Sequence, residues 1–359
     1  MDLMWAGGSM FTRWLAAAFS ALLVLPAPAS AQETLRLTVA AGHPPIFLWV
    51  KHLHETFIPT VDAELAKTGR YKVQWNEAYG GTLTKMGSEL ETMQQGISDL
   101  GIVATVFHSS KMPLNNVTYF VPFGPTDAER VVQAIDYVQT LPELSGEWKK
   151  HNVVYLAGFT LDSYGIAARM PLAKVEDFKG RKIGGAGPNL NWIKNTGAVG
   201  VQGSLNSFYN DIKSGVYDGA FVFMTAAVPA KLFETAPYFT ELDFGSMYAG
   251  AVAVNRTRWE RFPDEIKAAF RKAANAYKGL YLQEQTARIQ AAYAAWEKGG
   301  GKVVKVDAAE RAKLAKQIPN PTLDWAKQTG AGPAKKVLSA YMGTVRSGGF
   351  RFTRDFDKE

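Results

Sequence analysis

The alternation of apolar and polar residues predicts strands over Leu35–Ala40 and Tyr71–Trp75. Between them, residues 46–67 carry apolar side chains at helical spacing, with Pro59 as the expected break. The longest helical pattern covers Asp264–Lys298. A helix of that length would extend about 50 Å, which is longer than one lobe of a protein this size. We therefore expect it either to brace two lobes or to break once.

One pattern occurs twice: glycine, a hydroxyl residue and leucine, then a helical run, a glycine, an aspartate and an apolar strand. Its copies start at Gly81 and Gly203, and Gly96 and Gly215 are placed to end the two helical runs. The composition is globular, with 47% hydrophobic and 20% charged residues. Two copies predict two α/β lobes of similar design. A chance likeness is the alternative, because the copies share few identical residues.

The N-terminal segment has the pattern of an export signal. Trp14–Leu25 is an apolar run preceded by Arg13, and Ala29-Ser30-Ala31 matches the small-residue cleavage motif. The run is shorter than the ~20 residues that comfortably span a bilayer. We predict a signal peptide over residues 1–31, cleaved after Ala31, and a product located in the periplasm. An uncleaved anchor is the alternative.

Composition and motifs exclude several kinds of chemistry. The chain has 359 residues, no cysteine and a formal charge of +7. Without cysteine it has no disulfides, iron–sulfur clusters, thiolate metal sites or cysteine nucleophiles. His52 and His54 lie two apart on a predicted helix and cannot share a metal ion, and no hydrolase, P-loop or kinase motif occurs. We expect no metal, no cofactor and no enzymatic activity, and the scattered basic residues predict no nucleic-acid partner.

Several short motifs gain meaning from their order. They are His43-Pro44-Pro45 after the first strand, Gly80-Gly81-Thr82-Leu83, Gly96–Asp99, Val121-Pro122-Phe123, Val175–Ile183 and Gly215–Gly219. As an ordered set behind a signal peptide, they resemble the solute-binding proteins of tripartite ATP-independent periplasmic (TRAP) transporters, the C4-dicarboxylate-binding family. The resemblance implies a non-enzymatic periplasmic receptor that hands a small organic acid to membrane permease subunits.

The same resemblance implies an architecture: two α/β lobes around a ligand cleft, joined by a long bridging helix. We expect residues 32–160 and 251–300 to form the first lobe, including part of the long helix. Residues 161–250 and 301–359 are expected to form the second lobe and the C-terminal helices. The protein is expected to act as a monomer.

One position departs from the family pattern. The resemblance would place, directly after Lys182-Ile183, an arginine that pairs with the ligand carboxylate, and this chain has Gly184 there. The replacement that we favour is the set of backbone N–H groups in the glycine turn 184–187, which leads into a helix capped by Asn189. The side chain of Arg169 is another candidate. Alternatively, the glycines only allow close packing.

The candidate ligand-binding residues are mostly neutral and aromatic. An aromatic residue by itself is more often core than ligand-lining, but the missing arginine favours an aromatic cleft. The predicted set is His43, Trp49, Gly81, Thr105, Phe107, His108, Tyr164, Arg169, Gly184, Gly185, Gly187, Asn189, Asn191, Trp192, Phe223 and Tyr248. It predicts a small organic acid with an aromatic or apolar body, such as a benzoate-like compound. The alternatives are a C4-dicarboxylate or other small polar solute, a periplasmic sensor component, and an exported α/β enzyme.

Overall fold

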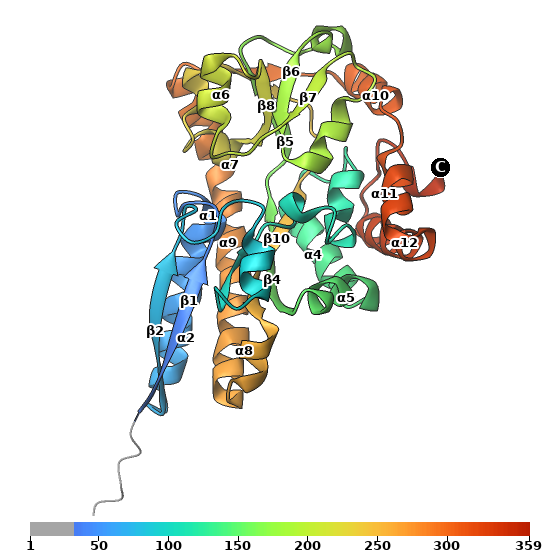
Figure 1. Cartoon of the computed structure of the whole chain (residues 1–359). Coiled ribbons are helices and arrows are strands. Elements are labelled where there is room, and N and C mark those ends of the chain that lie inside the picture. The colour runs from blue at the N-terminus through green and yellow to red at the C-terminus, as the bar shows by residue number, and fades with distance from the viewer. Residues whose placement is uncertain (1–31) are drawn as a thin grey trace, which may run out of the picture.

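The computed structural model describes residues 32–359, so the predicted signal peptide and its cleavage after Ala31 lie outside the described residues (Figure 1). The strands of residues 32–359 form two sheets. The first sheet has the order β2 (Tyr71–Ala78), β1 (Glu33–Ala40), β3 (Leu100–Val103), β10 (Met247–Asn255), β4 (Val153–Leu161). The second has the order β11 (Lys302–Lys305), β9 (Tyr238–Glu241), β5 (Tyr164–Ala168), β8 (Gly219–Phe223), β6 (Lys182–Gly185), β7 (Val199–Gln202).

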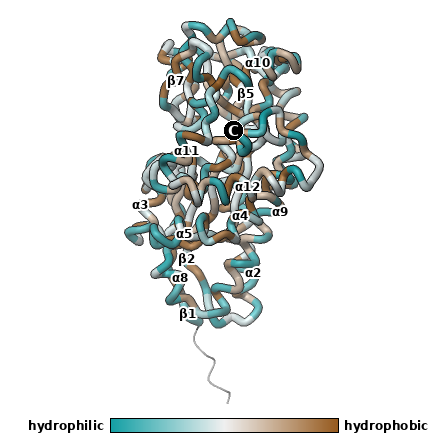
Figure 2. Tube along the Cα trace, turned by 90° about the vertical axis from the view of Figure 1, so that its right-hand side faces the viewer, coloured by the Kyte–Doolittle hydropathy of each residue, from teal (hydrophilic) through white to brown (hydrophobic). Residues whose placement is uncertain are grey.

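Helices surround both sheets and complete two α/β lobes, which confirms the expected fold class; hydrophobic stretches run through both of them (Figure 2). Around the first sheet lie α1 (Leu48–His52), α2 (Ile58–Ala66), α3 (Glu89–Gln94), α4 (Ala128–Gln139), α5 (Pro142–Lys150), α8 (Arg256–Arg261) and the 3₁₀ segments η2 (Thr105–His108) and η3 (Leu114–Phe120). Around the second lie α6 (Phe208–Ser214), α7 (Met224–Ala227), α10 (Ala308–Gln317) and the 3₁₀ segments η4 (Val175–Phe178) and η5 (Gly187–Ile193). Across residues 32–359, no helix has both the length and the apolar content to cross a membrane.

The longest helix, α9 (Asp264–Lys298), is continuous, as the helical pattern predicted. It packs on α2 and β4 of the first lobe and on α7 and β11 of the second (Figure 1). Tyr281 and Gln285 of α9 both donate hydrogen bonds to the carbonyl of Thr160, near the end of β4. The chain crosses to the second sheet directly after this point, so α9 braces both lobes and anchors the crossover between them.

The break expected at Pro59 takes the form of a change in helical winding. A π-helical turn, η1 (Leu53–Phe57), joins α1 to α2. The N–H of Ile58 bonds to the carbonyl of Leu53, five residues back. Proline has no N–H to continue the α-helical ladder, and the wider turn lets the chain continue past it. The helix therefore carries on from the loop near His43 down the side of the first sheet.

The two copies of the repeated pattern occupy equivalent places in the two lobes. In the first copy, the Asp99 N–H donates to the Thr38 carbonyl (2.9 Å), and its carboxylate accepts from the Thr38 N–H (2.8 Å). In the second copy, Asp218 makes the same pair of bonds with Lys182 (2.7 and 2.8 Å). Both preceding helices end near a glycine with positive φ, as predicted. This equivalence supports two lobes of one design over a chance likeness.

The C-terminal helices differ from the expected division. We expected residues 301–359 to belong with the second lobe, but α12 (Ala331–Ser347) packs against α4 and α5 of the first. The preceding helix, α11 (Pro321–Thr329), places the Trp325 ring on Phe120 at 5.6 Å between centroids. The Trp325 indole N–H donates to the Pro113 carbonyl (2.7 Å). The apolar faces of these helices therefore fix them to the first lobe, after the chain has already crossed to the second.

Candidate ligand-binding site

A cleft lies where loops and strand ends of the two lobes meet. Its cavity volume is about 40 Å³, and the empty space including its open mouth is about 470 Å³. The first lobe contributes His43, Trp49, Ala104, Val106, Phe107, Tyr119, Phe159, Leu161 and Ala249. The second contributes Tyr164, Ala186, Asn189, Ser204, Leu205, Phe208, Phe221 and Phe223. A ligand placed there would contact both lobes at once.

Part of the predicted set lines this cleft: His43, Trp49, Phe107, Tyr164, Asn189 and Phe223. The remaining predicted residues, which lie outside the lining, are Gly81, Thr105, His108, Arg169, Gly184, Gly185, Gly187, Asn191, Trp192 and Tyr248. Most of these residues support or neighbour the cleft. The predicted set therefore identifies the loops around the cleft, and six of its side chains line the cleft itself.

Trp192 and Tyr248 belong to the packing around the cleft. Trp192 is fully buried, stacks on Tyr119 at 5.9 Å and donates its indole N–H to the Tyr119 carbonyl (2.8 Å). It thus lies behind the wall that Tyr119 forms. Tyr248 and Ala249 are consecutive in β10, at a point where the strand is irregular. Ala249 lines the cleft, while the Tyr248 hydroxyl faces Gln139 of α4.

Three of the smaller predicted residues use their polar groups within the protein. The Gly81 N–H donates to the carbonyl of Ala41, in the loop after β1. The Thr105 carbonyl accepts from the Asn116 side chain (2.9 Å), and Thr105 is completely buried. The Asn191 side chain donates to the Pro188 carbonyl (2.8 Å). These bonds shape the loops that carry the cleft residues.

Aromatic rings occupy the place where the family pattern would put an arginine. A Cβ atom at Gly184 would lie 2.9 Å from the Tyr217 ring and 3.2 Å from the Phe208 ring. Tyr217 is held by a hydrogen bond from its hydroxyl to the Gln202 carbonyl (3.0 Å). Phe208 lines the cleft. Glycine is therefore required by packing, and an apolar ring stands where the resemblance predicted a cation.

The two replacements considered from the sequence do not supply a charge to this cleft. The Gly187 N–H already donates to the Gln202 side chain (2.9 Å), so the favoured glycine turn has one of its donors occupied. The Arg169 side chain is exposed and lies near the end of α6, 3.5 Å from the Lys213 carbonyl. Among the described residues, those that line the cleft include no Lys, Arg, Asp or Glu.

Stacked rings form the body of the cleft. Trp49 lies between Phe47 and Phe159, at 5.0 and 5.8 Å between centroids and with nearly parallel planes. Phe223 of β8 packs against Trp49 of the first lobe (6.0 Å) and against Tyr164 of its own lobe (5.1 Å). Burial raises the pKa of the Tyr164 hydroxyl well above its usual value, so this polar end of the wall stays neutral. Such an aromatic lining favours an apolar ligand body.

His43 is the most informative polar group of the lining. The Trp49 indole N–H, which can only donate, lies 3.4 Å from the His43 Nδ1 atom. Nδ1 therefore accepts, and Nε2 carries the proton of the neutral ring. Burial lowers the pKa of His43 from 6.5 to about 3, so the ring stays neutral under ordinary conditions. Within residues 32–359, its buried Nε2 atom has no hydrogen-bond partner.

Asn189 provides a second buried polar group in the cleft wall. It is 1% exposed, and its Oδ1 atom has no partner within the part of the chain that the structure describes. Gly185 makes room for it, because a Cβ atom at that position would lie 2.3 Å from Oδ1. The glycine turn that we singled out thus serves to admit the Asn189 carboxamide.

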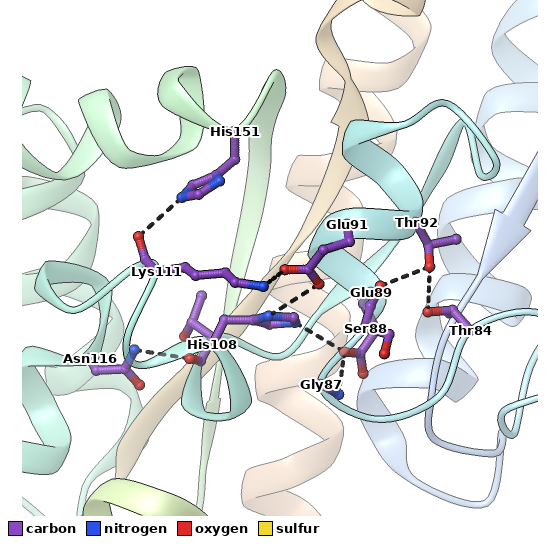
Figure 3. Close-up of polar contacts among 11 residues, drawn as sticks. Thr84, Gly87, Ser88, Glu89, Glu91, Thr92, His108, Lys111, Asn116 and His151 are labelled. Atoms are coloured by element: carbon purple, nitrogen blue, oxygen red, sulfur yellow. Dashed lines mark hydrogen bonds and ion pairs between the residues drawn. The ribbon is translucent and has the colours of Figure 1, made fainter.

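His108, by contrast, belongs to a buried polar cluster next to the cleft (Figure 3). Its Nε2 atom lies 3.1 Å from Glu89 and its Nδ1 atom 3.8 Å from Glu91, which also pairs with Lys111. The Glu89 carboxyl group also accepts a hydrogen bond from the Gly87 N–H (2.8 Å). The cluster ties α3 and its preceding loop to η2. Across residues 32–359, no group of three or more acidic or histidine side chains is arranged to hold a metal ion.

Sequence reasoning missed several lining residues, chiefly Tyr119, Phe159, Ser204, Phe208 and Phe221. The period of two along β8 could have found Phe221, because it lies on the same face as the selected Phe223. Ser204 belongs to the second Gly-Ser-Leu motif, which was recognised as a repeat but not as a site. No local signal marks Tyr119, Phe159 or Phe208, whose positions depend on the crossing of distant segments.

A direct contact between the lobes lies at the edge of the cleft. The Asn206 side chain, just before α6, donates to the Gly42 carbonyl (3.3 Å). Gly42 precedes His43 in the loop after β1, so this bond connects the second lobe to the loop that carries the polar donor.

The comparisons with known proteins agree with this architecture. The sequence matches the family model for "Bacterial extracellular solute-binding protein, family 7" over residues 49–328. No curated protein gives a significant match.

Similar solved structures share the fold at low sequence identity. One is a marine metagenome TRAP solute-binding protein specific for pyroglutamate, with 18% identity, a TM-score of 0.75, and coverage of 87% of this chain and 99% of that one. Another is a Bordetella pertussis extracytoplasmic solute receptor binding pyroglutamic acid (20%, 0.74, 86% and 99%). A third is a Desulfovibrio salexigens TRAP periplasmic solute-binding protein with bound orotic acid (16%, 0.75, 87% and 99%). The family match covers most of the chain, and this chain therefore belongs to family 7 of the bacterial extracellular solute-binding proteins.

Proposed function

We propose that this chain is the periplasmic receptor of a TRAP-type transporter, exported and cleaved after Ala31, and active as a monomer. It captures a small organic acid with an aromatic or otherwise apolar body and delivers it to membrane permease subunits. Similar proteins bind pyroglutamate and orotic acid, which are small cyclic acids. Those ligands support the organic-acid class for this cleft.

The observation that carries the ligand proposal is the character of the cleft wall. Trp49, Phe159 and Phe223 line the cleft as packed aromatic rings, and the rings of Tyr217 and Phe208 lie against Gly184, where the resemblance would place a carboxylate-binding arginine. A C4-dicarboxylate would bring two charges into a wall without a cation, and burying unpaired charges is strongly unfavourable. One polar head on an apolar body fits this wall better.

We further propose that the protein binds its solute without transforming it. A hydrolytic enzyme would need a nucleophile hydrogen-bonded to a base. His43 is the histidine of the lining, and its hydrogen bond is to Trp49. The cleft arrangement supports capture between two lobes, with closure made by contacts such as Asn206 to Gly42.

A thermal-shift comparison tests this proposal. The purified protein is incubated with benzoate, benzamide, succinate or malate at matched concentrations, and the melting temperature is measured. We expect the aromatic compounds to stabilise the protein more than either dicarboxylate. Stabilisation by succinate or malate alone would overturn the proposed ligand class. Mass spectrometry of solute co-purified with the protein would then identify the natural ligand directly.

A further inference from the structure

We infer that the cleft binds the head group of its solute in an uncharged form, through the neutral His43 donor and the Asn189 carboxamide. The groups that fit are a carboxamide, a lactam or a protonated carboxyl group. The inference rests on the proposed function and narrows its ligand. It assigns to His43 the contact that an arginine makes in the family pattern.

The donor follows from the chemistry of the pair formed by His43 and Trp49. An indole N–H has no acceptor capacity, so the His43 Nδ1 atom facing it must be unprotonated. The neutral ring then carries its single proton on Nε2. His43 is 5% exposed, and Nε2 has no partner among the described residues. A buried donor left without a partner is costly, and an oxygen of a bound ligand would satisfy it.

The acceptor is the side-chain oxygen of Asn189. It is buried without a partner in the described part of the chain, and the missing side chain of Gly185 gives it space. A carboxylate offers only acceptors, so it cannot satisfy this oxygen. An amide, a lactam or a protonated carboxyl group presents one acceptor and one donor. These groups complement both His43 and Asn189.

The electrostatics of the lining point the same way. The described residues around the cleft include no formal charge to balance an anion. Apolar surroundings favour the neutral form of a carboxyl group. Desolvation keeps His43 itself neutral, since its pKa is about 3. An anionic head would therefore be bound only after it takes up a proton.

Isothermal titration with benzamide and benzoate tests the inference on the wild-type protein. At pH 7 we expect benzamide to bind at least tenfold more tightly than benzoate. Between pH 8 and pH 5, benzoate affinity should rise about tenfold for each unit of acidification, because only the protonated fraction binds. Benzamide affinity should stay constant over this range.

Variants assign the effect to His43. His43→Phe keeps a ring and removes the donor, and should weaken benzamide binding at least tenfold; His43→Gln keeps an N–H donor and should recover part of that loss. His54 is an exposed histidine on the π-helical turn η1 and does not line the cleft, so His54→Phe is the matched control and should leave the affinity unchanged. Benzamide binding that is unaffected by His43→Phe would overturn the inference.

The outcomes separate this inference from the proposed function. Tighter binding of benzoate with a flat pH profile would overturn the uncharged head group and leave the aromatic-acid receptor standing. If neither compound binds and a dicarboxylate does, both proposals fail. The wild-type comparison stays decisive even if a variant does not fold.

Discussion

Two buried histidines of the first lobe show how differently a fold can treat the same side chain. His108 is 2% exposed, and its two ring nitrogens face Glu89 and Glu91. His43 is just as buried, but its protein partner is the indole N–H of Trp49, and its Nε2 atom has no partner among the described residues. A polar group that is satisfied within the protein serves the structure. One that is buried and unsatisfied marks where a ligand is expected.

The surroundings of His108 and of His43 also differ in their electrostatics. Around His108, burial alone would raise the pKa of Glu91, but the hydrogen bond from Lys111 and the charge of His108 outweigh burial and lower it. The cluster therefore favours the ionised form of Glu91. Around His43, burial acts without an opposing charge and keeps the ring neutral. One region is a cluster of polar groups paired with one another, and the other is a neutral cleft wall.

The largest expected effect breaks the cluster around His108. His108→Leu leaves the buried Glu89 side chain with the Gly87 N–H but without its histidine partner, which should lower the free energy of unfolding by about 3–5 kcal/mol. His43→Leu leaves only the Trp49 N–H unpaired and should cost about 1–2 kcal/mol. Urea unfolding of both variants measures the difference. Equal losses would show that the two histidines are structurally equivalent and would contradict the comparison.

The next effect concerns two aromatic residues, one that lines the cleft and one that faces away from it. Phe223 contacts Trp49 across the lobes and Tyr164 within its own lobe, so Phe223→Ala should weaken benzamide binding about 10- to 100-fold, in line with the loss of a buried aromatic face. Tyr248 faces α4, and Tyr248→Phe is the control that should leave affinity unchanged. Calorimetric titration of the two variants checks this assignment. A larger loss for Tyr248→Phe would place the ligand elsewhere.

The contrast between these two residues also shows what the sequence could predict. The long helix, the first two strands and the repeated units depend on local periodicity and glycine stops, and these were predicted well. The face of a sheet on which a given side chain lies is harder to predict. β10 is irregular between Tyr248 and Gly250, so the side on which a residue lies depends on a bulge that has no clear sequence signal.

The missing arginine also shows that sequence patterns do not predict contacts between distant segments. The sequence identified Gly184 as unusual, and the structure explains it by the rings of Tyr217 and Phe208. Those rings come from a helix and a turn about 25 to 35 residues further along the chain. Their meeting depends on tertiary packing, which a linear pattern does not encode. The position was therefore predictable, but the group that fills it was not.

A smaller effect concerns the pH dependence of stability without ligand. The pKa of His43 is lowered from 6.5 to about 3 by burial, so the unfolded chain binds a proton below pH 6.5 while the folded protein does not. Stability then falls as the pH decreases from 6.5 toward 3, by about 2 kcal/mol between pH 6.5 and pH 5. Urea unfolding at both pH values measures this loss. His43→Asn should reduce it, and an unchanged loss would show that other groups cause the acid sensitivity.

The smallest effect tests how the neutral wall is closed over its ligand. Asn206 donates to the Gly42 carbonyl from the opposite lobe, and a single exchangeable hydrogen bond of this kind contributes about 0.5–1.5 kcal/mol. Asn206→Ala should therefore weaken benzamide binding only about two- to tenfold, through a larger open population. Small-angle scattering should show a larger radius of gyration for the variant than for the wild type without ligand, and the same radius at saturation. The polar head would still be recognised by His43, so the preference for benzamide over benzoate should persist. Loss of that preference would mean that closure itself, and not the neutral donor, selects the head group.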